Sequence, residues 1–330
     1  MTTQEIYNPV ITECGVQHRQ ALEGLGAGLV AYNEPLAAYS TWRIGGPADV
    51  LIEPTDAAGL SRVLTYAAEN HIPTVVIGDG SNVLFADVGF RGIVIHIGRA
   101  MSDVSIDGST IHAQAGVAIP RLARIAAVAG LSGIEHTAGI PGSLGGLVAM
   151  NGGSLRQNIG QVIESVRCLD RTGAVMELAA AECDFSYRHS LFLDRPWIVT
   201  DVVLKLEQKQ RRFILDRMLE ILRERRHKYP RRIPNCGSVF KSDAELHKRC
   251  GPPGWIIEQT GLKGLRIGGA EVSAQHANFI LNKDNAAAAD VLELIQTIRH
   301  RVHEKFGLWL ECEVRHIRPD GKIVQAHLEC

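Results

Sequence analysis

The sequence predicts a protein of mixed α and β structure with more than one domain. Its 330 residues exceed the roughly 250–300 at which a single hydrophobic core stops growing. Apolar residues recur with helix-type and strand-type periods in turn along the chain. The composition changes at Gln208, where a segment dense in Arg and Lys begins. We therefore expect a domain boundary at this point and two or three domains in all.

The first half of the chain is predicted to alternate short strands and helices. A strand at 48–53 precedes a helix that starts at Thr55 or Asp56, and its inward face comprises Leu60, Val63, Leu64 and Ala67. Strands are expected at 74–77, 83–85, 92–97, 104–106 and 110–115. A helix over 120–129 follows and ends at Gly130, with its inward residues Leu122, Ile125, Ala126 and Ala129. Residues 1–38 carry no motif, so regular structure is expected to start at Tyr39.

The second half continues with strands and two long helices. Strands are predicted at 162–170, 175–178, 197–206 and 308–317. The basic segment 209–232 is predicted to form a helix that Pro230 ends, with an apolar stripe of Met218, Leu219 and Leu222. The last helix, 287–306, places five residues on one face, namely Val291, Leu294, Ile295, Ile298 and Val302.

Charge and cysteine content exclude several classes of protein. Thirty-five basic and thirty-six acidic residues give a net charge of −1, which offers no global field for nucleic acid. Any phosphate site must therefore be local. The seven cysteines are odd in number and lack a C-x-x-C pair, which argues against disulfides and against a metal site. Neither a signal peptide nor a membrane-length apolar run is visible, so we expect a cytoplasmic protein without a membrane partner.

Glycine is over-represented, with 33 residues, and eight of these lie between Gly130 and Gly153. Glycine-rich turns after strands suggest phosphate binding, because they let backbone N–H groups approach an anion. The turn 78–82 lacks the third glycine of a dinucleotide fingerprint and any Walker lysine, and 142–143 does not fit a nucleophile elbow. Tight turns are the plainer interpretation of each cluster. Together with 41–46, however, they could line one pyrophosphate-bearing cofactor.

Three polar residues stand out, each with a structural alternative. Arg188 lies between strands and could hold a carboxylate, or it could form a surface salt bridge. Ser238 lies in a turn, where serine usually bonds local backbone. Glu313 shares a strand face with Glu311 and Arg315 that could simply be solvated. Cys236 has no nearby histidine that would activate it, so a structural role is expected.

Seven short segments of the chain stand in an order that is specific when taken together. They are 41–49, 78–82, 138–146 with 150–152, 187–188, 237–240, 261–282 and 313–315. In this order they resemble the UDP-N-acetylenolpyruvoylglucosamine reductases of bacterial cell-wall synthesis. The resemblance extends from about Tyr39 to Ile317, and the short spacing from Arg188 to Ser238 is similar to that of the type II subgroup.

The resemblance implies an α+β fold. A two-lobed FAD-binding domain of the vanillyl-alcohol-oxidase (PCMH) type would be followed by an α+β substrate-binding domain. The implied division is an N-terminal extension at 1–38, an FAD-binding domain at 39–207 with lobes 39–108 and 109–207, a substrate-binding domain at 208–307, and a C-terminal strand and tail at 308–330 that returns to the active site.

The resemblance also implies that FAD lies between the lobes, held by backbone N–H groups around its pyrophosphate. The implied cofactor-binding residues are Thr41, Arg43, Gly45, Gly46, Gly78, Gly80, Ser81, Asn82, Ala138, Gly139, Ile140, Pro141, Gly142, Ser143, Gly145 and Gly146. The implied substrate contacts are Tyr187, Lys228, Lys241, Arg266, His276 and Asn278.

The implied reaction takes a hydride from NADPH through FAD to C3 of the enolpyruvyl ether of UDP-N-acetylglucosamine, giving UDP-N-acetylmuramate. Arg188 and a protonated Glu313 would stabilise the charge that develops on the enolpyruvyl carboxylate. Ser238 would donate a proton to C2. The implied partner is therefore this UDP-sugar substrate, and we expect a monomer.

Three segments depart from the family pattern: 153–156 near the flavin, and 242–243 and 250–255 where the sugar nucleotide would bind. They leave two alternatives open. One is a flavin reductase of the same fold that acts on a different enol ether or modified amino-sugar nucleotide. The other is a non-catalytic sugar-nucleotide-binding paralogue, against which the joint presence of Arg188, Ser238 and Glu313 argues.

Overall fold

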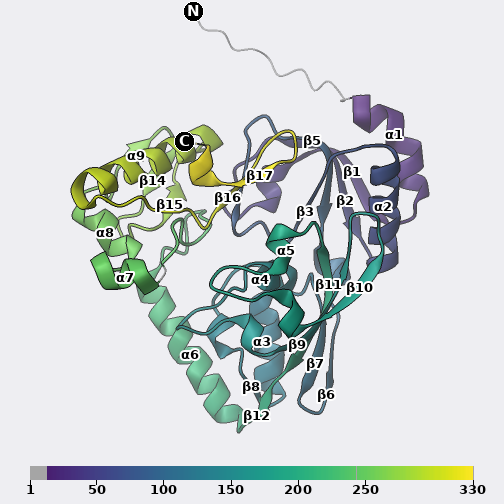
Figure 1. Ribbon diagram of the computed structural model, residues 1–330, viewed down its shortest axis with the longest axis horizontal. Helices are drawn as coiled ribbons and strands as arrows, with labels where there is room; N and C mark the ends of the chain where they lie inside the picture. The colour runs from purple at the N-terminus through teal and green to yellow at the C-terminus, as the bar shows by residue number, and fades with distance from the viewer. Residues whose placement is uncertain (1–12, 243, 330) are drawn as a thin grey trace, which may run out of the picture.

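The first part of the chain forms a four-stranded sheet. The structure, a computed structural model, describes residues 13–242 and 244–329 (Figure 1). The strand order is β1 (Gly28–Pro35), β2 (Pro47–Pro54), β5 (Phe90–His96) and β3 (Thr74–Ile77). Only the β1–β2 pair is antiparallel. The central strand β2 is buried on both faces, as its nearly unbroken apolar run requires.

Two helices accompany this sheet. The inward face of α2 (Ala57–Glu69) contains the four apolar residues that the sequence predicts. The Asp56 carboxylate caps α2 by accepting a hydrogen bond from the Gly59 N–H at 2.6 Å. Before the sheet, α1 (Glu13–Gly24) lies against β1 and β2. The expected start of regular structure at Tyr39 is therefore wrong, because α1 and β1 precede it.

A second sheet of five antiparallel strands follows. Its order is β10 (Val175–Ala179), β9 (Ile163–Leu169), β11 (Ile198–Lys205), β7 (Thr110–Gln114) and β6 (Val104–Asp107). The helices α3 (Ile119–Val128) and α4 (Leu144–Ala149) join β7 to β9. One continuous hydrophobic core contains residues of both sheets, including Ile52 and Val166. The predicted helix face was partly wrong, since Leu122, Ala123, Ala126 and Ala127 are buried and Ala129 is exposed.

The helix α6 (Arg211–Lys228) leads from the second sheet to the third group of elements. Figure 1 shows it along the lower left edge, from the pair β8 (Leu131–Ser132) and β12 (Glu207–Gln208) to the remaining helices. Its buried residues are Ile214, Met218 and Ile221. The sequence placed Leu219 in this stripe, but Leu219 is 49% exposed, because the contact with α3 and with η3 (Glu135–Thr137) is narrow.

The third group has its own core. It contains α7 (Ala244–Cys250), α8 (Pro253–Gln259), α9 (Ala288–Phe306) and a small sheet of β13 (Arg266–Ile267), β14 (Ala270–Val272) and β15 (Ile280–Asn282). All five predicted inward residues of α9 are buried. Trp42 is fully buried in this core and donates its indole N–H to the Ile280 carbonyl at 2.8 Å. The first sheet and the third group are thereby joined.

The C-terminal segment returns to the first part of the chain. Only Arg315–Ile317 of the predicted strand 308–317 forms a regular strand, β16, which runs parallel to β4 (Val83–Phe85). β17 (Ile323–Gln325) completes this three-stranded sheet. The remaining short elements are η1 (Leu36–Tyr39), η2 (Arg99–Met101), η4 (Ile159–Gln161), η5 (Ala180–Cys183), α5 (Leu191–Asp194) and η6 (Ala326–Leu328). The division into four segments expected from the resemblance stays a prediction.

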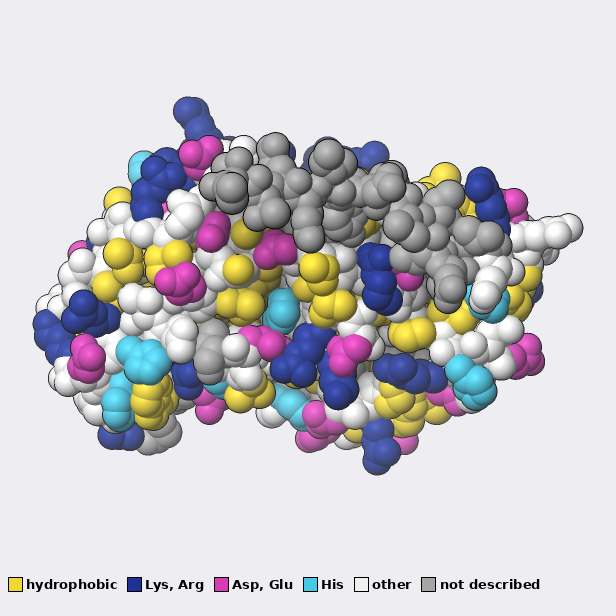
Figure 2. Space-filling model, turned by 90° about the horizontal axis from the view of Figure 1, so that it is seen from above, with side chains coloured by type: hydrophobic (Ala, Val, Ile, Leu, Met, Phe, Trp, Pro, Cys, Tyr) yellow, Lys and Arg dark blue, Asp and Glu magenta, His cyan; other side chains and the backbone are white. Residues whose placement is uncertain are grey.

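The surface carries charges of both signs, as the near-neutral composition implies. Seen from above, charged side chains of both signs are interspersed (Figure 2). Five described cysteines, at 168, 183, 236, 250 and 312, carry free thiols. Among the helices of residues 13–242 and 244–329, none is long and apolar enough to cross a membrane.

Candidate active site

A cavity of about 2500 Å³ lies where the two large sheets, α6 and the C-terminal segment meet. A pocket for one drug-sized molecule usually measures about 300–1,000 Å³, so this cavity has room for a dinucleotide and a further nucleotide. Its wall includes fourteen Lys or Arg residues but only five Asp or Glu, although the whole chain carries a net charge of −1. The near-neutral composition leaves room only for a local phosphate site, and the cations of this wall are gathered in that way.

The two glycine-rich turns lie face to face in this cavity. A Cβ atom on Gly78 would lie 2.0 Å from the Ser143 hydroxyl, and one on Gly142 would lie 2.8 Å from the Ser81 hydroxyl. Gly80 has a φ of +60°, which favours glycine. In the described part of the chain, the backbone N–H groups of Gly80, Ser81 and Gly142 donate no hydrogen bond to protein. The missing side chains let the turns pack this closely, and the N–H groups left over are donors that fit a diphosphate.

The predicted cofactor residues divide into two groups. Fourteen of them line the cavity, namely Thr41, Arg43, Gly78, Gly80, Ser81, Asn82, Ala138, Gly139, Ile140, Pro141, Gly142, Ser143, Gly145 and Gly146. Gly45 and Gly46 do not, because they pack behind it. A Cβ atom on Gly45 would meet Phe85, and one on Gly46 would meet the Asp87 carbonyl.

Arg188 and Glu313 form an ion pair on the cavity wall. The Arg188 Nε lies 2.8 Å from a Glu313 carboxylate oxygen, and the side chains are 21% and 17% exposed. The Arg188 guanidinium also donates to the Gly153 carbonyl at 3.2 Å. Burial raises the pKa of Glu313, while the neighbouring Arg188 acts in the opposite direction. The solvated strand face considered for Glu313 is therefore not observed.

Ser238 reaches the same cavity, and the two residues that follow it are held between Asn278 and Glu313. The Val239 N–H donates to the Asn278 carbonyl at 2.9 Å, and the Glu313 N–H donates to the Val239 carbonyl at 2.8 Å. The Asn278 side chain donates to and accepts from the backbone of Phe240, both at 2.9 Å. These bonds place the serine, which the sequence separates widely from Arg188 and Glu313, at the wall that contains them.

Cys236 lies close to Ser238 but carries no sign of activation. Its side chain is buried, and burial raises the pKa of the thiol well above its usual value, with the nearby Glu313 adding to the effect. A thiolate is therefore disfavoured. This agrees with the structural role expected from the sequence.

The six expected substrate contacts lie in different places. Tyr187 and Lys228 line the cavity, and the Tyr187 hydroxyl donates to the Ser242 carbonyl at 2.8 Å. The other four lie outside its wall. Lys241 pairs with Glu311 at 3.3 Å, Arg266 lies 3.8 Å from Glu271, His276 packs against aromatic rings, and Asn278 holds the Phe240 backbone. Their roles toward a ligand stay predictions.

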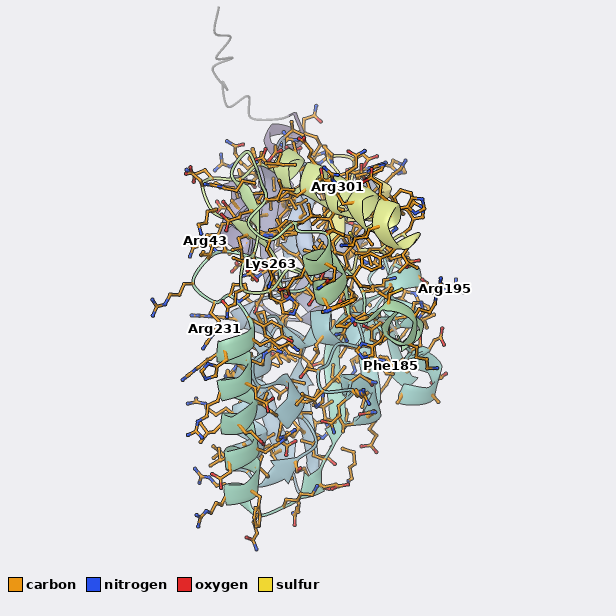
Figure 3. The ribbon with its side chains drawn as sticks, turned by 90° about the vertical axis from the view of Figure 1, so that its left-hand side faces the viewer. Arg43, Phe185, Arg195, Arg231, Lys263 and Arg301 are labelled. Atoms are coloured by element: carbon orange, nitrogen blue, oxygen red, sulfur yellow. The ribbon has the colours of Figure 1, made fainter. Side chains whose placement is uncertain are left out.

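Sequence reasoning missed most of the cavity's cations. Beyond Arg43, Arg188 and Lys228, the wall includes Arg124, Arg156, Arg171, Arg195, Arg225, Arg226, Arg231, Arg232, Lys248, Arg315 and Lys322. The run Arg223–Arg232 was visible in the sequence but was interpreted only as a helix. Figure 3 labels Arg231 just beyond the end of α6 and Arg43 in the loop before β2. Since the Asn235 N–H donates to the Thr41 carbonyl at 3.1 Å, the two loops that carry these arginines are in contact.

The chain is an FAD-dependent oxidoreductase by its fold and by its matches. Residues 48–179 match the family described as FAD binding domain, and residues 228–317 match that described as UDP-N-acetylenolpyruvoylglucosamine reductase, C-terminal domain. The chain belongs to the UDP-N-acetylenolpyruvoylglucosamine reductase family. This confirms the resemblance, the expected fold class and the expected FAD.

Relatives from several bacteria support the assignment. The UDP-N-acetylenolpyruvoylglucosamine reductase 1 of Corynebacterium glutamicum is 43% identical over 292 residues, which cover 88% of this chain and 87% of the relative. The reductase of Heliobacterium modesticaldum is 43% identical over 87% of this chain and 90% of its own length. The crystal structure of the Thermus caldophilus reductase superposes with a TM-score of 0.73 at 35% identity, covering 87% of this chain and 98% of that one.

Proposed function

We propose that the protein catalyses the NADPH-dependent, FAD-mediated reduction of the enolpyruvyl ether of UDP-N-acetylglucosamine to UDP-N-acetylmuramate, a precursor of peptidoglycan. The observation that carries this proposal is the arrangement of Arg188, Glu313 and Ser238 on one cavity wall, next to the glycine turns. The names of the similar proteins, which describe a reductase of UDP-N-acetylenolpyruvoylglucosamine, support the choice of substrate.

FAD, when bound, supplies the hydride chemistry that no protein side chain provides. The glycine turns hold it through their unpaired N–H groups, and the cavity's excess of cations attracts the anionic nucleotides. The same arginines would also favour binding of NADPH and of the UDP-sugar substrate, which both carry phosphates. The residues of this chain then have three tasks: to orient the enolpyruvyl group, to stabilise its developing charge and to deliver a proton.

Arg188 and Glu313 would act on the substrate carboxylate together. A protonated Glu313 can accept the Arg188 Nε–H with one oxygen and donate its own O–H to the substrate with the other. The Arg188 guanidinium has further N–H groups for the same carboxylate. The raised pKa of Glu313 favours this protonated state, and fixed donors of this kind stabilise an enolate-like charge.

Ser238 would give its proton to C2 after the hydride reaches C3, so that both hydrogens of the reduced product are accounted for. A serine hydroxyl is a weak acid, and it suits this step because the acceptor is a strongly basic, carbanion-like carbon. The backbone bonds of Val239 and Phe240 hold the serine in one place while the proton moves.

A two-step anaerobic titration tests the proposal. NADPH should bleach the yellow protein, and UDP-N-acetylglucosamine enolpyruvate should then restore the flavin absorbance and yield a product two hydrogens heavier. Bleaching without reoxidation would reject this substrate. Reoxidation by a different enol ether would then favour a flavin reductase of the same fold with another substrate. Ser242, one of the departures from the family pattern, lines the cavity and would be the first residue to examine in that case.

A further inference from the structure

The helix α6 connects the cofactor turns to the segment that carries Ser238. Its first turns pack on α3 and on the start of the second glycine turn. Ile214 and Met218 form one cluster with Ala123, Ala127 and Ala138. At its end, the His227 carbonyl accepts a hydrogen bond from the Gln275 side chain at 2.9 Å, within the third group of elements. Figure 3 shows α6 running up one side of the molecule towards Arg231.

Arg225 lies on α6 where these two sets of contacts meet. Its Nε donates to the carbonyl of Gly139, in the second glycine turn, at 3.0 Å. The two segments are packed so closely that a Cβ atom on Gly139 would lie 2.6 Å from both Cδ and Nε of Arg225. Gly139 does not have a positive φ, so the absence of a side chain is required here by space alone.

Arg225 also contacts an aromatic pair that leads to the serine segment. Its guanidinium lies 4.9 Å from the centre of the Tyr229 ring, and that ring stacks on Phe279 at 5.1 Å. Asn278, next to Phe279, holds the backbone of Val239 and Phe240. A continuous set of contacts therefore runs from Gly139 through Arg225, Tyr229 and Phe279 to the residue that follows Ser238.

We propose that Arg225 is a positioning residue that fixes the 138–146 turn for FAD and couples it, through Tyr229, to the segment that carries Ser238. The guanidinium keeps the Gly139 carbonyl turned towards α6. The neighbouring N–H groups of the turn then stay directed at the cofactor. Arg225 does this without taking part in hydride or proton transfer.

The test is the dissociation constant of FAD from apoprotein, measured by quenching of flavin fluorescence, and it needs no sugar nucleotide. It is therefore independent of the substrate proposed above. Arg225→Met and Gly139→Ala should each raise this constant about tenfold or more, the equivalent of one charge-assisted hydrogen bond. Because both changes break the same contact, the double variant should bind FAD no more weakly than the weaker single variant.

Two further comparisons separate positioning from a general loss of stability. Arg223→Met, an exposed arginine on the same helix outside the cavity wall, should leave the constant unchanged. Tyr229→Phe should behave like the natural protein because the ring is kept, whereas Tyr229→Leu should weaken FAD binding about threefold. An unchanged constant in Arg225→Met, or a double variant whose effect is the product of the single effects, would overturn the proposal. If Arg225→Met does not fold, Gly139→Ala and the Tyr229 pair decide in the same way.

Discussion

Replacing Glu313 by glutamine or by alanine separates the roles that its carboxyl group can have. Glutamine keeps the shape of a protonated carboxyl: its oxygen can accept the Arg188 Nε–H, now 2.8 Å from the carboxylate, and its amide can donate to the substrate. Alanine keeps neither function. Glu313→Gln should therefore reoxidise reduced flavin within about tenfold of the natural rate, whereas losing one preorganised donor in Glu313→Ala should cost about 10²–10³-fold, or about 2.7–4 kcal/mol.

The same pair of variants also tests how reoxidation of the flavin by substrate depends on pH. Burial raises the pKa of Glu313, so its donating form is present at low pH and is lost as the pH rises through that raised pKa. Reoxidation by substrate should follow this fall in the natural protein and should lose it in Glu313→Gln, whose amide does not titrate. Stopped-flow reoxidation between pH 5 and about 9 measures both effects. A glutamine variant that is as slow as the alanine variant, or that keeps the natural pH profile, would refute the reasoning.

Two further predictions concern the cofactor turns and the buried histidine. Gly78→Ala should weaken FAD binding about tenfold, because the new Cβ would lie 2.0 Å from the Ser143 hydroxyl, and Ser143→Gly added to it should restore binding; no restoration would contradict the steric argument. His136 is 1% exposed, and burial lowers its pKa to about 4, so stability is lost as the pH falls from about 6.5 towards 4. The free energy of unfolding, measured by urea titration at pH 7 and at about pH 4.5, should fall by about 2–3 kcal/mol less in His136→Phe than in the natural protein. An equal fall in both proteins would assign the loss to other groups.

The fold was predictable wherever local periodicity decides burial. The inward faces of α2 and α9 follow directly from their apolar spacing, and Asp56 is one of the two caps that the sequence allowed. Sequence reasoning failed where tertiary contacts decide. β1 was missed because its pairing with β2, and not its own composition, makes it a strand. Leu219 was misplaced because only a narrow stripe of α6 is covered.

The segments that form the site could be predicted from the sequence, but the contacts between them could not. The glycine turns could be recognised, yet their mutual fit depends on Gly78 after β3 and Ser143 before α4, which are far apart in the sequence. The ion pair of Arg188 and Glu313 joins segments that no spacing rule connects. Arg225 could be seen only as one cation of the basic helix, because its partner is a backbone carbonyl that a sequence does not display.

The most direct test of the account compares the two half-reactions of Ser238→Ala. The account assigns this serine only to proton delivery at C2. NADPH should therefore bleach the flavin at the natural rate, while UDP-N-acetylglucosamine enolpyruvate should reoxidise it about 10²–10⁴-fold more slowly. Equal losses in both half-reactions, or a natural rate of reoxidation, would contradict the account.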